Sequence, residues 1–204
     1  MELNHEVARD LLAIQAVQIN PDHYFTWTSG IKAPIYCDNR LTMSYPTVRK
    51  KITEAFAKKI AVMEEKPDCI AGCATAGIPH AAWLADFLNL PMVYVRSKPK
   101  GHGKENQIEG NFEKGQNVLV IEDLISTGTS AIDASQALQK EGANVLGVLA
   151  IFTYGLPQSK ENFANVNIPF QTITNFDQLL DALLADGDIT ADEKEQLLAW
   201  RDAF

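Results

Sequence analysis

Short apolar runs alternating with stretches of helical periodicity are the feature that most constrains the fold of this chain. Three such runs are 69–73, 92–95 and 118–121, and residues 77–88 carry apolar side chains at helical spacing between the first two. Uninterrupted apolar runs are typical of strands that are buried on both faces. The alternation therefore predicts an α/β fold, with a central, mostly parallel sheet flanked by helices.

The rest of the chain extends this pattern. Residues 24–40 mix aromatic and β-branched residues with Ser29-Gly30 and Pro34, which predicts a small hairpin-like lobe. Thr190, followed three residues later by Glu193, matches a capping box at the start of a C-terminal helix. The further predicted elements are helices over 2–17, 45–65, 131–142, 175–185 and 191–204 and a strand over 145–152.

Composition and charge exclude several classes of protein. A formal net charge of -8 disfavours a nucleic-acid partner, because such binding needs many cations on one face. No apolar run approaches the roughly 20 residues that span a bilayer, and the N-terminus lacks a basic region followed by an apolar one. Cys37, Cys69 and Cys73 match no zinc-ligand spacing and are expected to be free thiols. These features predict a cytoplasmic protein with no membrane partner.

One segment departs from the acidic character of the chain. Residues 96–104 hold four permanent cations and a histidine within nine positions. Gly101 and Gly103 flank His102 and give the backbone the freedom that a mobile loop needs. The segment is interpreted either as a solvated cationic linker or as a lid that closes over an anionic ligand.

The stretch 118–130 carries the strongest chemical signal, because it joins a buried strand to a helix through a turn rich in hydroxyl groups. The start of a helix offers unpaired N–H groups and the positive end of its dipole, so this turn suits a phosphate. The adjacent carboxylates of Glu122 and Asp123 would repel that phosphate unless they bind sugar hydroxyls or magnesium. A ribose 5-phosphate satisfies both requirements.

Two other interpretations of this stretch stay open at this point. Glu122 and Asp123 could be a solvated strand end that is followed by an ordinary helix cap. A nucleotide hydrolase with Asp123 on magnesium is the second, but that class needs Gly-x-x-x-x-Gly-Lys-[Ser/Thr]. Residues 72–77 have the glycine spacing and continue with Ile78-Pro79 instead, which disfavours a hydrolase.

The acid pair and the hydroxyl-rich turn resemble the phosphoribosyl-diphosphate signature of type I phosphoribosyltransferases. The segments 25–36, 71–79 and 96–103 match, in order and spacing, those of the orotate phosphoribosyltransferases, and the similarity covers roughly 25–152. The resemblance implies the type I fold with a small N-terminal hood lobe. It also implies transfer of the 5-phosphoribosyl group from 5-phospho-α-D-ribose 1-diphosphate to orotate, giving orotidine 5'-phosphate and diphosphate in pyrimidine biosynthesis.

The same resemblance implies the organisation of the chain and its partners. Residues 1–204 would form one phosphoribosyltransferase domain, with a core over about 44–175 and a hood made of about 18–43 plus the terminal segments. The enzyme would be a homodimer whose basic lid is shared between subunits. Its cofactor would be Mg²⁺, bound mainly through the substrate, with Asp123 as a candidate ligand.

Roles for individual residues also come from the resemblance. The lid cations Lys100, His102 and Arg96 would be catalytic. The Ala74–Thr75 peptide would be cis, as is frequent in the family's diphosphate loop. The residues implied to bind phosphoribosyl diphosphate are Glu122, Asp123, Ser126, Thr127, Gly128, Thr129, Ser130, Thr75, Ala76 and Gly77. Those implied to bind orotate are Lys32, Tyr36, Cys37, Arg40 and Thr127.

The chain departs from the better-known family pattern at three positions. Thr28 and Ala76 stand where many members have lysine, and Tyr154 stands where many have arginine. We hypothesise that Arg40 supplies the missing cation for the orotate carboxylate, the alternative being that it is a surface arginine. Two other functions fit the same motif: a phosphoribosyltransferase for another base, and a non-catalytic nucleotide-sensing regulator. Lys100 and His102 in a glycine-flanked loop favour turnover.

Overall fold

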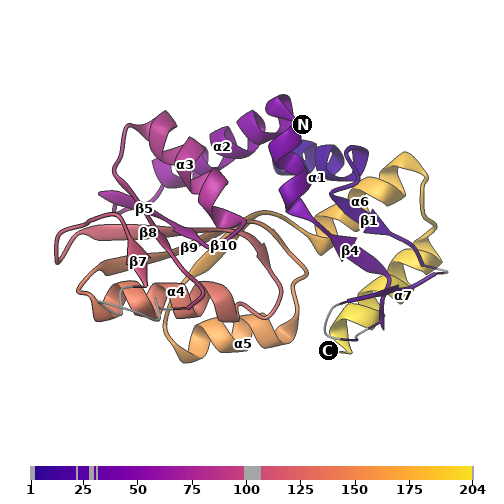
Figure 1. Cartoon of the computed structure of the whole chain (residues 1–204). Helices are drawn as coiled ribbons and strands as arrows, with labels where there is room; N and C mark the ends of the chain where they lie inside the picture. The colour runs from indigo at the N-terminus through magenta and orange to yellow at the C-terminus, as the bar shows by residue number, and fades with distance from the viewer. Residues whose placement is uncertain (1–2, 22, 28–29, 31, 99–106, 204) are drawn as a thin grey trace.

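The computed structural model describes residues 3–21, 23–27, 30, 32–98 and 107–203. A central sheet carries helices on both faces, and a smaller group of elements lies beyond one end of it (Figure 1). In chain order the elements are α1 (Leu3–Ala13), β1 (Val17–Ile19), β2 (Phe25–Thr26), β3 (Lys32–Ala33), β4 (Ile35–Cys37), the 3-10 helix η1 (Asn39–Ser44), α2 (Pro46–Ala61), β5 (Cys69–Cys73), α3 (Gly77–Leu88), β6 (Met92–Val95), β7 (Ile108–Glu109), β8 (Asn117–Ile125), α4 (Thr129–Lys140), β9 (Asn144–Thr153), α5 (Pro157–Asn165), β10 (Phe170–Asn175), α6 (Phe176–Asp186) and α7 (Ala191–Asp202).

The strand order of the six-stranded sheet decides where a ligand can bind. The order is β10-β9-β8-β5-β6-β7, and every neighbouring pair is parallel except β6 with β7. The chain proceeds outward from β5 in one direction and outward from β8 in the other, so these two adjacent strands form a topological switch point. Ligands of open α/β sheets bind beyond the carboxyl ends of the strands at such a point.

Alternation along the strands builds a core on each face of the sheet. Ile70, Leu119 and Ile121 face the cluster that includes residues of α2 and α3, whereas Val118 and Val120 face the one that includes residues of α4 and α5. Figure 1 shows α2 and α3 on one side of the sheet and α4 and α5 on the other. The predicted α/β fold, with a mostly parallel sheet between helices, is confirmed.

The predicted hood lobe is present. β1 pairs with β4 and β2 pairs with β3, both antiparallel, and these strands lie near α1, α6 and α7 at one end of the molecule (Figure 1). Val7 and Leu11 of α1 share a hydrophobic cluster with Phe176 and Leu180 of α6. The division of 1–204 into a core over 44–175 and a hood stays a prediction. No helix within the described part of the chain is long and apolar enough to cross a membrane.

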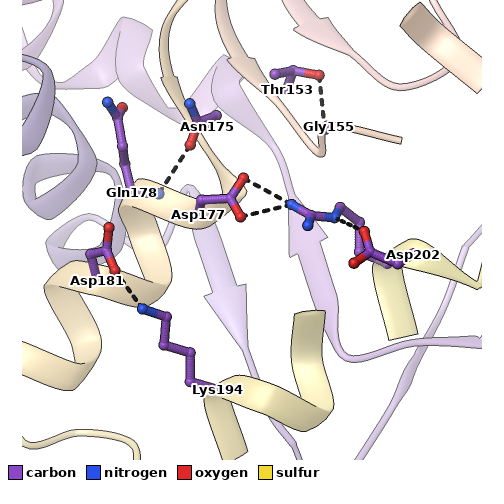
Figure 2. A network of polar contacts seen from close by, with 9 residues as sticks. Thr153, Gly155, Asn175, Asp177, Gln178, Asp181, Lys194 and Asp202 are labelled. Atoms are coloured by element: carbon purple, nitrogen blue, oxygen red, sulfur yellow. Dashed lines mark hydrogen bonds and ion pairs between the residues drawn. The ribbon is translucent and has the colours of Figure 1, made fainter. Parts of the chain in front are cut away.

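Polar contacts hold the two C-terminal helices together (Figure 2). Arg201 donates through Nη1 to both carboxylate oxygens of Asp177, each at 2.8 Å, and Lys194 contacts Asp181. The predicted capping box at Thr190 and Glu193 is confirmed, since each side chain accepts the other residue's backbone N–H. These contacts link α7 to α6, which itself packs against α1.

The structure corrects some predicted boundaries. The helix predicted over 2–17 ends at Ala13, because Gln15 adopts a left-handed φ of 58° and Val17 begins a strand paired with β4. The helix predicted over 45–65 ends at Ala61, where Lys66 Nζ donates to the carbonyls of Ile60, Ala61 and Met63. β7, α5 and β10 were not predicted.

Candidate active site

A cavity of about 530 Å³ lies at the carboxyl ends of β5 and β8, at the switch point of the sheet. It brings together three segments that the sequence singled out separately: the 25–40 segment, the loop after β5, and the acid pair of β8. Its lining residues are Cys37, Asp38, Arg40, Ala74, Thr75, Ala76, Glu122, Asp123, Leu124 and Ser130.

Glu122 and Asp123 belong to β8 itself, which continues four residues beyond the predicted end at Ile121. The pairing of β8 with β5 ends at Gly72 and Ile121, whereas its pairing with β9 continues to Ile125. The two acids therefore lie on the part of β8 that extends beyond β5, next to the cavity. Glu122 is buried, and its Oε1 accepts the Asp123 backbone N–H at 3.0 Å.

Burial and mutual proximity disfavour negative charge on this pair of acids. Burial, together with the neighbouring Asp123 charge, raises the pKa of Glu122 to about 9. Burial also raises the pKa of Asp123 above its ordinary value. Two adjacent desolvated carboxyls hold both charges only when hydroxyl donors or a cation reach them. A vicinal diol, a divalent ion or both would meet this requirement.

The loop after β5 is built for close backbone approach. A Cβ at Gly77 would lie 2.4 Å from the Ile121 carbonyl oxygen, and one at Gly72 would lie 2.9 Å from the Ile78 Cα. The absence of these side chains lets α3 begin directly against β5 and β8. The Ala74–Thr75 peptide is cis, as the family resemblance implies. Ala76, at a position where many members have lysine, lines the cavity and supplies no cation.

The hydroxyl-rich turn at 126–130 has the geometry of an anion site. Gly128 adopts a φ of 85°, and a Cβ there would lie 2.5 Å from Phe163 Cε2, so only glycine fits. The exposed hydroxyls of Thr127 and Thr129 lie 3.1 Å apart. Because α4 begins at Thr129, its first-turn N–H groups lack partners within the helix. Ser130 also lines the cavity, which places this turn beside the acid pair.

The residues predicted to contact orotate are divided by the structure. Cys37 and Arg40 line the cavity, but Lys32, Tyr36 and Thr127 are absent from the described residues that do so. Arg40 Nε and Nη2 donate to the two carboxylate oxygens of Asp38, at 2.6 and 2.9 Å. This pairing holds the pKa of Asp38 below its ordinary value. The role of Arg40 as the orotate cation stays a prediction, and any carboxylate ligand would have to share Arg40 with Asp38.

Desolvation also affects the cysteine at the cavity wall. Burial, with the charges of Asp123 and Asp38, raises the pKa of the Cys37 thiol well above its ordinary value. Cys37, Cys69 and Cys73 are all free thiols, as predicted. A neutral thiol beside the acid pair suits packing against a flat ligand better than nucleophilic attack.

Of the predicted lid residues, Arg96 is described, whereas Lys100 and His102 lie outside the described residues, as does Thr28. Arg96 lines a small cavity of about 60 Å³ that shares Ala74 and Ser130 with the main one. Its Nη1 lies 3.6 Å from Oε1 of Glu109, on the strand that follows the basic segment. The catalytic roles of the three lid residues stay predictions.

Tyr154, at the position where many members have arginine, is part of an aromatic cluster. It is buried, and Trp27 stacks on it with a centroid separation of 4.9 Å. Trp27 also contacts Trp200 of α7 edge-on at 6.1 Å, and its Nε1 donates to the Ile35 carbonyl at 2.9 Å. An aromatic cluster therefore occupies a position where a cation is common in the family, and Tyr154 is not among the described residues that line the cavity.

Sequence reasoning missed several residues of the site. Asp38 and Leu124 line the cavity, and the buried Asn39 contacts the backbone of Asp123. The sequence could have identified Asp38 and Asn39, because they are consecutive polar residues directly after the apolar-aromatic run 35–37. It could not have identified Leu124, because an aliphatic residue in a strand predicts only a buried core position.

The donor set fits a magnesium ion that is held partly by substrate. Asp38, Glu122 and Asp123 offer carboxylate oxygens to the cavity. Within the described ranges, however, no group of three or more His, Cys, Asp or Glu side chains could hold a metal ion by itself. Mg²⁺ is commonly bound by one or two carboxylates together with substrate phosphates and water.

A switch-point cavity with an acid pair on one side and a helix-start turn on the other defines a class of α/β protein that binds a phosphorylated sugar. Comparison with known families refines this class. The family model described as the phosphoribosyl transferase domain matches residues 44–172. The chain belongs to this family.

Individual relatives agree with this assignment. The chain is 61% identical over 202 residues to an orotate phosphoribosyltransferase from Oceanobacillus iheyensis, covering 99% of this chain and 100% of the relative. It is 52% identical to the Bacillus subtilis protein of the same name, covering 98% and 92%.

Solved structures share the fold. The orotate phosphoribosyltransferase from Aeropyrum pernix superposes with a TM-score of 0.75 at 28% identity, covering 87% of this chain and 97% of that one. The UMP synthase from Leishmania donovani superposes with a TM-score of 0.80 at 27% identity. That match covers 98% of this chain but 42% of the longer UMP synthase chain.

Proposed function

We propose that this chain transfers the 5-phosphoribosyl group from 5-phospho-α-D-ribose 1-diphosphate to orotate, giving orotidine 5'-phosphate and diphosphate in pyrimidine biosynthesis. The observation that carries the proposal is the cavity at the switch point, which gathers the 35–40 segment, the loop after β5 and the acid pair of β8. The near full-length identity to proteins named orotate phosphoribosyltransferase supports orotate as the acceptor base.

The substrate is proposed to lie across the carboxyl ends of β5 and β8. The ribose hydroxyls donate to Glu122 and Asp123, whose buried carboxyls need donors of this kind. The 5-phosphate accepts from the turn at 126–130, and the diphosphate lies against the backbone of the loop at 74–77. Orotate lies toward Cys37 and Arg40, with Arg40 nearest its carboxylate.

The chemistry follows from the charge that develops. As the bond from ribose C1 to the diphosphate oxygen breaks, positive charge grows on the sugar and negative charge on the departing diphosphate. Orotate N1 attacks C1 directly and releases its N1–H proton to solvent, and no covalent enzyme intermediate forms. Arg96, Lys100 and His102 neutralise the leaving group and exclude competing water. Asp123, together with substrate oxygens, would hold Mg²⁺, which would supply further positive charge against the diphosphate.

The assembly and location belong to the same proposal. The chain acts in the cytoplasm as a homodimer in which the basic segment of each subunit closes over the site of its partner. Subunit complementation tests the shared lid. Mixing Lys100→Ala chains with Asp123→Asn chains creates dimers in which one site carries both lesions and the other carries neither. Recovered activity is expected, whereas the absence of recovery in demonstrated mixed dimers would show that each subunit uses its own lid.

A direct assay tests the reaction. Protein, Mg²⁺, orotate and phosphoribosyl diphosphate are mixed, and the loss of orotate absorbance is followed, with uracil, hypoxanthine and adenine tested in parallel. We expect turnover with orotate and loss of at least about 100-fold of it in Asp123→Asn. Asp68→Asn, which changes an acid next to the opposite end of β5, is the matched control and should remain active. Preferred turnover of another base would refute the orotate assignment.

A further inference from the structure

A chain of buried polar side chains runs from α3 through η1 to the backbone of the acid pair. Asn39, Thr42 and His80 are each 2% exposed or less. Asn39 Nδ2 donates to the Asp123 carbonyl at 2.7 Å, and Thr42 Oγ1 donates to the Asn39 carbonyl at 2.6 Å. Thr42 Oγ1 also lies 3.2 Å from His80 Nε2. These contacts connect three elements that are far apart in sequence.

The protons of this chain can be assigned from its geometry. The Thr42 hydroxyl has one proton, and the Asn39 carbonyl can only accept it. The same hydroxyl must therefore accept from His80, which requires the proton of the neutral imidazole to be on Nε2. Burial lowers the pKa of His80 to about 4, so the ring is neutral near pH 7. Every link in the chain then has a defined direction, from His80 to Thr42 to Asn39 to the Asp123 carbonyl.

This series of hydrogen bonds ends at Asp123, and that position indicates what the series can do. The β5–β8 pairing stops at Gly72 and Ile121, so Asp123 lies beyond the last residue that β5 pairs. The Asn39 amide gives the Asp123 carbonyl a donor where β8 is no longer paired with β5. Asn39 also lies between the cavity residues Asp38 and Arg40. Its side chain thus fixes the backbone of the acid pair relative to the 35–40 segment.

An alternative is that the three residues only fill the core. Apolar residues of similar volume would do this without leaving buried polar atoms, yet Asn39 Oδ1 and His80 Nδ1 have no hydrogen-bond partner among the described residues. Leaving such acceptors buried is unfavourable, and a network that keeps them specifies one geometry rather than adding packing.

We propose that Asn39 is a positioning residue for Asp123, held in place by Thr42 and His80, and that η1 thereby fixes the ribose-binding carboxylate relative to the base-binding wall. This inference rests on the proposed function, because it assigns Asp123 to the ribose. Asn39 itself touches no substrate, so its removal should displace Asp123 while leaving the cavity wall at Cys37 in place.

Steady-state kinetics of matched variants test the proposal. Asn39→Asp keeps the size of the side chain but replaces its N–H donors with acceptors. We expect it to raise KM for phosphoribosyl diphosphate by about tenfold or more, and KM for orotate by less than about threefold. His80→Leu should shift KM in the same direction by less, and His80→Gln, whose amide can replace the Nε2 donor, should restore it. If Asn39→Asp does not fold, Thr42→Val tests the same proposal, because it removes the hydroxyl that donates to the Asn39 carbonyl.

The controls separate positioning from folding and from the proposed function. Thr53→Val removes another buried hydroxyl, which donates to the Arg49 carbonyl at 3.0 Å within α2, and should lower the melting temperature without changing either KM.

Folded Asn39 variants with unchanged KM for phosphoribosyl diphosphate would overturn the inference, as would an equal rise in both KM values. If wild type leaves orotate unchanged, the proposed function fails. Calorimetric binding of phosphoribosyl diphosphate to wild type and Asn39→Asp then decides the inference: no difference in affinity overturns it.

Discussion

The carboxyl end of β8 and the α6–α7 pair differ in whether their ionisable side chains have partners of opposite charge. At β8, Glu122 is only 6% exposed, and no ion pair between it and a cation is found within the described residues. At α6–α7, Arg201 and Lys194 form complementary ion pairs with the more exposed Asp177 and Asp181 (Figure 2). The first region holds buried carboxyls whose ionised forms need a ligand, whereas the charges of the second region are already paired within the fold.

This difference separates residues that serve function from residues that serve stability. Burying carboxyls without partners is unfavourable for folding, and such sites persist where a ligand uses them. Exposed ion pairs and helix caps add small increments of stability and do not depend on a substrate. Substitutions near β8 should therefore change activity more than stability, and substitutions at α6–α7 should do the reverse.

The largest effect is expected at the basic segment that would face the acid pair across the substrate. Lys100→Ala should lower kcat by about 100-fold or more with little change in affinity for phosphoribosyl diphosphate, because its contact should strengthen as the diphosphate departs. Lys98→Ala removes the same charge from the same segment and should lose less than about threefold. Steady-state kinetics and calorimetry measure the two quantities, and a normal kcat would remove Lys100 from catalysis.

A smaller effect is expected at the cavity wall. Arg40→Ala should raise KM for orotate by about tenfold while kcat changes less, since it removes binding that is equal in the ground and transition states. Arg49→Ala, which removes an arginine stacked on Trp83 at 4.9 Å rather than one lining the cavity, is the control. An unchanged KM for orotate in Arg40→Ala would make Arg40 a surface arginine paired with Asp38.

The pH dependence of stability sharpens the comparison at Glu122. Its pKa rises from 4.5 to about 9 on folding, so folding is favoured below about pH 4.5, and this stability is lost as pH rises toward 9. Glu122→Gln should therefore match wild type below about pH 4.5 and be several kcal/mol more stable near pH 8, while losing activity. Denaturant unfolding at several pH values measures this, with the exposed Glu161→Gln as control. A constant difference across the range would contradict the assigned shift.

The smallest effect is expected at the C-terminal pair of helices. Arg201→Ala should destabilise the protein by about 1 to 2 kcal/mol, because its side chain is only 13% exposed and contacts both Asp177 and Asp202. kcat should stay within about twofold. Lys50→Ala, which removes a 76% exposed partner of Glu54, should cost less than about 0.5 kcal/mol. A fall in kcat without loss of stability in Arg201→Ala would contradict the assignment of the α6–α7 ion pairs to stability rather than to function.

The elements that sequence predicted well have local causes. The strands at 69–73 and 92–95 and the helix at 77–88 match β5, β6 and α3 because their apolar patterns are complete and their ends are marked. β8 was predicted too short because the apolar run stops at Ile121, whereas pairing with β9 carries the strand through two acids. That extension depends on a neighbouring strand, which no local pattern reveals.

The site shows the same division. Glu122, Asp123, Thr75 and Ala76 were predicted from motifs and the family resemblance, and the structure places them around one cavity. The contact between Asn39 and the Asp123 carbonyl joins residues 84 positions apart, so it could not be read from spacing. From the sequence, Tyr154 was noted only as a departure from the family pattern. Its stacking on Trp27 could not be predicted, because it depends on how the hood lies against the end of β9.

The most direct test of the ribose-phosphate site is a crystal structure of the protein with Mg²⁺ and phosphoribosyl diphosphate. We expect the ribose hydroxyls within hydrogen-bond distance of Glu122 and Asp123, and the 5-phosphate at the start of α4 beside Thr129. Ligand bound elsewhere, or bound with its phosphate away from this turn, would contradict the assignment of the acid pair to the sugar.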